Sequence, residues 1–76
     1  MENLITQIKK NSSEVYRIYE KEYEVYKFID VRIYYMDKNS GEYKPTKKGI
    51  SIMPNNVEDI INGILKAMEV MGYEKK

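Results

Sequence analysis

The chain of 76 residues contains no cysteine, no histidine and no tryptophan. The absence of cysteine excludes disulfide bridges and thiolate zinc sites. The absence of histidine removes the commonest neutral metal ligand and the usual general base of enzymes. The sequence also lacks a phosphate-cradling glycine loop and any metal-ligand spacing. We therefore expect a protein that is not an enzyme and that holds no metal and no cofactor.

Long apolar runs are missing as well. No segment approaches the roughly 20 apolar residues that are needed to span a bilayer, and residues 1–10 lack the uninterrupted apolar region of a signal peptide. We therefore expect an intracellular protein with no membrane partner. Its location would be the cytoplasm or nucleoid, or the nucleus if the organism is eukaryotic.

Neither sign of charge is in excess, because 13 Lys and Arg face 12 Asp and Glu for a net charge of +1. The signs are unevenly placed, however. Lys44, Lys47 and Lys48 cluster around Pro45, whereas three glutamates fall within residues 20–24. A near-neutral protein with one basic face still binds phosphates. Eight tyrosines add rings suited to half-buried positions and interfaces.

A chain of this length forms one domain at most, and such a domain buries only about 60% of its unfolded surface. Residues 1–13 are polar with a few aliphatic side chains, and we interpret them as a flexible arm or a short helix. Residues 14–76 then form the domain. Small domains without disulfides or metals often oligomerise, which is a first indication of a dimer.

Alternating apolar residues predict strands in the middle of the chain. Residues 14–26 fit either a helix or a strand. Residues 28–36 alternate clearly, with Ile29 to Tyr35 in odd positions on one face and Phe28 to Tyr34 in even positions on the other. Residues 37–41 have the composition of a turn. Residues 42–44 predict a short strand that Pro45 ends, and residues 49–53 alternate again.

The last part of the chain predicts an amphipathic helix. Its apolar residues recur at the i, i+3, i+4, i+7 spacing from Val57 to Met71. Asn55 or Asn56 is a suitable N-cap, and Gly72 is a suitable end. One small sheet is not large enough to bury both its own apolar surface and the apolar stripe of this helix. We therefore expect a homodimer formed through helix-to-helix contact. The residues expected at its interface are Ile60, Ile64, Leu65, Met68 and Met71.

Two blocks of sequence resemble a known family. They are I-D-V-R-I-Y-Y at residues 29–35 and G-E-Y-K-P-T-K-K-G-I-S-I at residues 41–52. Both are similar to the single-stranded-DNA-binding C-terminal domain of the eukaryotic transcriptional positive cofactor four and its prokaryotic and viral relatives. The resemblance implies an α+β fold, in which a curved antiparallel four-stranded sheet is followed by one C-terminal helix. It also implies a homodimer whose sheets grip single-stranded DNA.

The resemblance carries site residues with it. The family's strand arginine falls on Arg32, and its DNA-stacking aromatic falls on Tyr35, where the family often has tryptophan. An aromatic in the connection between the first two strands matches Tyr23 or Tyr26. The family's cations fall on Lys44, Lys47 and Lys48, to which we add Lys27. Three glutamates in residues 20–24 depart from the more basic family pattern and make that connection a poor phosphate contact.

Several of these residues also have structural interpretations. The lysine cluster is a common guard of an edge strand, and Arg32 lies two residues from Asp30, with which it would form an ion pair. Simple alternation puts Arg32 and Tyr35 on opposite faces, so both reach DNA only if the strand bends or bulges. In the alternative, Tyr35 belongs to the core and Tyr34 is the exposed ring.

The sequence therefore predicts a homodimer that binds single-stranded DNA with low sequence specificity, in transcription regulation or in DNA replication or repair. Its cations would neutralise phosphates while its tyrosines stack on bases. One alternative is a protein-interaction adaptor that docks on transcription or replication proteins. Another is an RNA-binding module.

Overall fold

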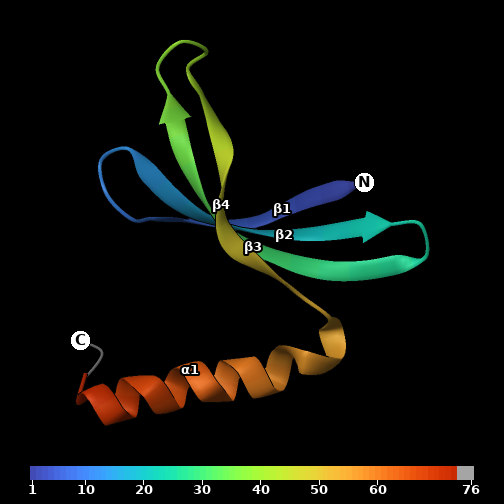
Figure 1. Ribbon diagram of the computed structural model, residues 1–76, viewed down its shortest axis with the longest axis vertical. Coiled ribbons are helices and arrows are strands. Elements are labelled where there is room, and N and C mark those ends of the chain that lie inside the picture. Colours follow the sequence, from blue (N-terminus) through green and yellow to red (C-terminus); the bar gives the residue numbers. More distant parts are fainter. Residues whose placement is uncertain (74–76) are drawn as a thin grey trace.

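Four strands form one antiparallel sheet, and a single helix follows them (Figure 1). The computed structural model describes residues 1–73, so residues 74–76 of the predicted domain lie outside the described part. The sheet is open and strongly curved, with the strands side by side in chain order. Its strands are β1 (Glu2–Lys9), β2 (Glu14–Tyr23), β3 (Tyr26–Asp37) and β4 (Glu42–Ile52), and α1 (Val57–Met71) follows a 3-10 turn, η1 (Pro54–Asn56). The predicted α+β class, with four strands followed by one helix, is confirmed.

The first strand corrects the prediction for the N-terminal segment. Residues expected to be a flexible arm or a short helix instead form β1, which pairs with β2 from Glu2 to Lys9. A bulge at Ile5 shifts the register, so Leu4 pairs with Tyr19 and Ile8 with Tyr16, on opposite faces of the sheet. Because the bulge breaks the period of two, the aliphatic residues of this segment do not show the alternation that identifies a strand.

The central pair of strands is regular. β2 and β3 pair without interruption from Glu14 opposite Tyr35 to Tyr23 opposite Tyr26, which resolves the ambiguity over residues 14–26 as strand. The tight turn between them contains Glu24, whose φ is +56°. The predicted alternation of residues 28–36 is confirmed, because cross-strand partners lie on the same face.

Pro45 does not end a strand, contrary to the prediction. β4 runs through it from Glu42 to Ile52, and the interruption is a bulge. Arg32 pairs with Gly49 and Tyr34 pairs with Pro45, so residues 46–48 lie opposite Ile33 alone. We call residues 46–48 the β4 bulge. An edge strand tolerates proline because one row of its backbone groups has no partner strand.

The two faces of the sheet differ in chemistry. We define the polar face by Arg17, Tyr19, Asp30, Arg32 and Tyr34, and the apolar face by Tyr16, Ile18, Val31, Ile33 and Ile50, from the pairing register. Among the described residues the buried hydrophobic side chains are Val15, Tyr19, Tyr34 and Ile52. Three of these lie together on the polar face as the small core of the sheet. The aliphatic residues of the apolar face are only partly covered.

A buried carboxylate ties three strands together on the polar face. Asp30 is 2% exposed. Its oxygens accept bonds from Arg32 Nε at 3.1 Å and Nη2 at 3.0 Å, and from Ser51 Oγ of β4 at 3.2 Å. Lys21 Nζ of β2 lies 3.8 Å away. Burial opposes ionisation, but the hydrogen bonds from Arg32 and the positive charges outweigh it and lower the pKa of Asp30.

Helix α1 begins and ends as predicted, but its side chains are not buried against the rest of the protomer. Asn56 is the N-cap residue, Glu58 and Asp59 lie in the first turn, and Gly72 closes the helix in the left-handed conformation. Its amide donates to the Glu69 carbonyl while that of Tyr73 donates to Met68. No residue of α1 is buried. None of the helices in residues 1–73 is both long and apolar enough to cross a membrane.

The protomer has a large exposed surface for its size. Its accessible area is 6485 Å², whereas a compact monomer of this mass exposes about 4,900 Å². Its radius of gyration is 14.5 Å, against about 11 Å for a compact domain of this length. The excess arises because α1 stands apart from the sheet (Figure 1), so apolar surfaces on both elements stay uncovered.

Gly49 has no room for a side chain. An added Cβ would lie 2.7 Å from the Val31 carbonyl oxygen and 2.8 Å from Arg32 Cβ. We expect Gly49→Ala to lower the free energy of unfolding in urea by about 1–3 kcal/mol. Gly63→Ala is the matched control, because its Cβ would meet no described side chain within 4 Å. It should stabilise the helix by up to about 1 kcal/mol. Equal stability of Gly49→Ala and the wild type would contradict the observed packing.

The ionised Asp30 predicts acid sensitivity. Its pKa is lowered in the folded state from an ordinary value of 3.8. The stabilisation is therefore present at neutral pH and is lost as the pH falls through the folded pKa. We expect the free energy of unfolding to decline between about pH 5 and pH 2, and to decline less in Asp30→Asn.

Candidate nucleic-acid interface

The residues predicted to contact DNA fall into two groups at opposite ends of β3. One group surrounds the β4 bulge and contains Arg32, Tyr35, Lys44, Lys47 and Lys48. The other lies at the tip of the β2–β3 hairpin and contains Tyr23, Tyr26 and Lys27. Tyr26 and Tyr35 are nine residues apart on one strand, which corresponds to about 30 Å. The two hairpins also point in different directions (Figure 1).

Tyr35 and Lys44 are cross-strand partners on the same face of the sheet. Tyr35 is 41% exposed, whereas Tyr34 on the opposite face is 6% exposed. The structure thus rejects the alternative in which Tyr34 is the exposed ring and Tyr35 the core residue. Lys44 Nζ lies 3.0 Å from Asp37 Oδ2, and this hydrogen bond raises the pKa of Lys44. An exposed ring and a charged ammonium group therefore lie side by side.

Lys47 and Lys48 are exposed on the β4 bulge. Thr46 organises the backbone there: its hydroxyl donates to the Ile33 carbonyl at 2.7 Å and accepts from the Lys48 amide at 3.1 Å. Beside Lys48 the apolar face has a shallow hollow, lined by Tyr16, Val31, Arg32, Ile33, Lys48, Gly49 and Ile50. Sequence reasoning did not select Tyr16, which is 38% exposed and adds another ring to the hollow that Lys48 lines.

Arg32 lies on the opposite face of β3 from Tyr35. The only register shift between β3 and β4 leaves the period of β3 unbroken, because the extra residues belong to β4. The guanidinium of Arg32 is engaged with the protein itself. It donates two bonds to Asp30, which confirms the ion pair considered from the sequence, and Nη1 donates to the Thr46 carbonyl at 3.0 Å. Arg32 and Tyr35 therefore do not share a surface within one protomer.

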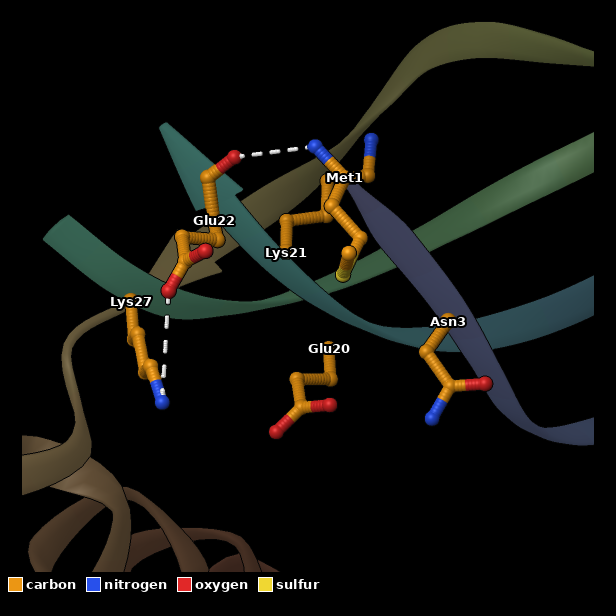
Figure 2. A pocket seen from close by; sticks show the side chains of 6 residues that line it. All are labelled: Met1, Asn3, Glu20, Lys21, Glu22 and Lys27. Atoms are coloured by element: carbon orange, nitrogen blue, oxygen red, sulfur yellow. Dashed lines mark hydrogen bonds and ion pairs between the residues drawn. The ribbon is translucent and has the colours of Figure 1, made fainter. Parts of the chain in front are cut away.

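The hairpin tip combines exposed rings with paired charges. Tyr23 and Tyr26 lie opposite each other in the register and are 68% and 58% exposed. Lys27 Nζ points toward Glu22 Oε2 at 3.9 Å (Figure 2). The pocket drawn there also contains Glu20 and the N-terminal amine, which donates to the Glu22 carbonyl. Because the glutamates offset the cations, the tip offers stacking more than phosphate attraction.

One cluster on the polar face was missed from the sequence. The Arg17 guanidinium lies 5.0 Å from the ring centroid of Tyr34 and 5.1 Å from that of Tyr43. It donates to Gln7 Oε1 at 2.8 Å and to the Tyr19 hydroxyl at 3.0 Å. The members of this cluster come from all four strands. Since the register alone brings them together, no local pattern could have identified them.

The arrangement suits binding through charge and stacking. Within residues 1–73 no three side chains of the metal-binding types His, Cys, Asp and Glu converge to hold a metal ion. The exposed groups around the β4 bulge are ammonium groups and phenol rings, which attract phosphates and stack on bases.

Comparison with known proteins identifies a family. A sequence profile described as Transcriptional Coactivator p15 (PC4) matches residues 10–63. The chain is 40% identical over 50 residues to the RNA polymerase II transcriptional coactivator SUB1 of Saccharomyces cerevisiae. This alignment covers 66% of the chain and 16% of the yeast protein, so the chain matches only a small part of that relative.

Solved structures share the fold. A PC4 homolog from Burkholderia pseudomallei superimposes with a TM-score of 0.82 at 31% identity, covering 88% of this chain and 97% of that one. A bacteriophage T5 homolog of the eukaryotic coactivator PC4, implicated in recombination-dependent DNA replication, superimposes with a TM-score of 0.73. At 18% identity, over 93% of this chain and 81% of that one, this likeness concerns the fold alone. The chain belongs to the PC4 family of transcriptional coactivators.

Proposed function

We propose that this member of the PC4 family binds single-stranded DNA as a homodimer with little sequence preference, in transcription regulation or in DNA replication or repair. The observation that carries the proposal is the surface around the β4 bulge. There the exposed ring of Tyr35 lies beside Lys44, and Lys47 and Lys48 are exposed on the adjoining segment. Cations for phosphates and a ring for bases are the two components of single-strand binding surfaces.

The mechanism assigns a task to each group. Lys47 and Lys48 neutralise phosphates, whereas Lys44 contributes less because Asp37 pairs with it. Tyr35 stacks on a base at about 1–3 kcal/mol. Because rings accept any base and ammonium groups contact the backbone, little sequence preference results. Tyr23 and Tyr26 at the hairpin tip provide a second site for base stacking. Lys27 contributes only weakly to phosphate binding there, because Glu22 pairs with it.

Related proteins support the biological setting. The yeast relative is a coactivator of RNA polymerase II, and the phage T5 homolog is implicated in recombination-dependent replication. We accordingly propose that transcription or replication machinery provides the protein partners of this chain. Such a function places the protein with the DNA, in the nucleoid or cytoplasm of a prokaryote or in the nucleus of a eukaryote.

The exposed helix supports the homodimer. Ile61, Ile64 and Leu65 of α1 are 49%, 59% and 57% exposed, and Met71 is 76% exposed. A soluble chain gains free energy by covering such a stripe, at about 25 cal/mol per Å² of apolar area. A second copy of α1 presents the same stripe, so a twofold contact between Ile60, Ile64, Leu65, Met68 and Met71 of each protomer is self-complementary.

Binding to oligothymidine at several salt concentrations tests the DNA-binding function. We expect single strands to bind more tightly than duplex, with log K falling against log salt at a slope of about −1.4 for the two phosphates that Lys47 and Lys48 neutralise. Lys47→Glu and Lys48→Glu should each weaken binding about tenfold or more, because each substitution replaces attraction by repulsion. Lys38→Glu, in the β3–β4 turn, is the control with the same charge change.

Other outcomes of this titration decide between functions. Unchanged affinity in both variants would contradict the lysine interface and favour a protein-interaction adaptor. Tighter binding to duplex than to single strands would exclude the proposed function. A competition between DNA and RNA oligomers of one sequence separates the proposed DNA binding from RNA binding.

The helix-mediated dimer is tested by substitution on α1. We expect the wild type to sediment as a dimer, and Ile64→Asp and Leu65→Asp to sediment as monomers, because each buries a carboxylate in an apolar contact. Asn62→Asp introduces the same charge on the polar side of the helix and should remain dimeric. Dimers that persist in both apolar-to-Asp variants would show that the protomers associate elsewhere.

A further inference from the structure

We propose that Arg32 is a positioning residue, which holds the β4 bulge in place so that Lys47 and Lys48 can contact phosphates, and that it makes no phosphate contact itself. This inference rests on the proposed function and refines it. It assigns a different task to the arginine that the family resemblance places among the DNA contacts. Its geometry lies entirely within one protomer.

The charge and most of the N–H donors of Arg32 are already used in contacts within the protein. Three of the five N–H donors of an arginine are used, two on Asp30 and one on the Thr46 carbonyl. Only 21% of the Arg32 side chain is exposed, and the Asp30 side chain is 3% exposed. The low pKa of Asp30 keeps its carboxylate ionised. A phosphate approaching Arg32 would therefore meet a guanidinium whose own charge is offset by Asp30 and most of whose donors are occupied.

The third bond of Arg32 reaches the start of the bulge. Where residues 46–48 of β4 lie opposite Ile33 alone, the regular ladder is interrupted. The Thr46 hydroxyl replaces the missing ladder hydrogen bonds there, since it donates to the Ile33 carbonyl and accepts from the Lys48 amide. Arg32 Nη1 in turn donates to the backbone carbonyl of Thr46. Backbone and side chain of Thr46 are thus fixed from β3 at two points.

Gly49 provides an independent observation at the end of the bulge. A Cβ at this position would approach both Cβ and Cγ of Arg32 to 2.8 Å. The arginine side chain therefore lies directly against the backbone that follows Lys48. The bulge is bounded by Arg32 at both ends, through a hydrogen bond at Thr46 and through packing at Gly49.

Restraint of the bulge matters because two long side chains must meet phosphates from it. A lysine loses side-chain freedom when it binds, and a mobile backbone would add its own ordering cost. Arg32 removes the cost of ordering the backbone before DNA binds, because it restrains Thr46. Its planar guanidinium can do so because it bonds Asp30 twice and still reaches the Thr46 carbonyl.

Four variants distinguish a positioning role from a phosphate contact. If Arg32 contacts phosphate, Asp30→Asn frees a positive charge and tightens binding to oligothymidine. If Arg32 positions the bulge, Asp30→Asn weakens binding. Thr46→Val changes no charge, yet it should weaken binding about tenfold and reduce the salt slope by about 0.7 or more. Arg32→Lys keeps the charge but loses the fork, and it should weaken binding as much as Arg32→Gln does.

Matched controls and a second readout complete the test. Thr6→Val makes the same substitution on β1, away from the bulge, and should bind like the wild type. A double variant of Arg32→Lys and Thr46→Val should bind no more weakly than Arg32→Lys alone, because both act on one restraint. Tighter binding by Asp30→Asn, or wild-type binding by Thr46→Val, would overturn the inference. Urea unfolding of each variant identifies the conditions under which it is folded.

Amide hydrogen exchange separates this inference from the proposed function. The Lys48 amide donates to Thr46 Oγ1, so it should exchange faster in Arg32→Lys and Thr46→Val without any DNA present. If the wild type fails to bind single strands, the proposed function fails, and faster exchange at Lys48 still establishes the restraint. If single strands bind but exchange at Lys48 is unchanged in Arg32→Lys, the positioning role is wrong while the function stands.

Discussion

The compensated charge of Asp30 is the interaction on which the rest of the sheet depends. A buried carboxylate is costly unless donors and opposite charges surround it. Here the donors come from three strands, since Lys21 lies on β2, Arg32 on β3 and Ser51 on β4. The register that satisfies Asp30 is the register that also brings Arg17 between two tyrosine rings. Because a shift by one residue would turn the side chains of one strand to the other face, the network is compatible with this strand alignment and not with its neighbours.

The division of the protomer into two faces explains its incomplete packing. The polar face contains the small core and its hydrogen-bond networks, whereas the apolar face and α1 keep partly exposed aliphatic surfaces. Short strands and one helix cannot enclose both surfaces at this chain length. The proposed dimer would cover the helix, while the hairpin formed by β3 and β4 would keep its lysines and Tyr35 in solvent. Assembly and ligand binding would then use different parts of the same protomer.

The sequence predicts elements wherever one period extends over many residues. The alternation of residues 28–36 and the helical spacing from Val57 onward both have this property, and both are confirmed. The errors occur at the two bulges. The bulge at Ile5 breaks the alternation by which β1 would be recognised. The bulge at residues 46–48 breaks the alternation of β4, so the sequence predicts two short strands on either side of Pro45. A bulge is visible only against its partner strand, so local sequence cannot show it. For the same reason, local sequence does not show that Tyr35 pairs with Lys44 or that Arg32 reaches Thr46.

Both irregularities lie on the outer strands, and the central β2–β3 pair has none. An outer strand presents unpaired backbone groups that can recruit a strand from another molecule, which begins aggregation. In β4, Pro45 lacks one of these donors and the displaced residues 46–48 break the straight row that an incoming strand would need. The segment proposed to contact nucleic acid therefore also protects solubility. A variant with a regular β4 would gain ladder hydrogen bonds and lose the barrier that prevents sheets of neighbouring molecules from joining edge to edge.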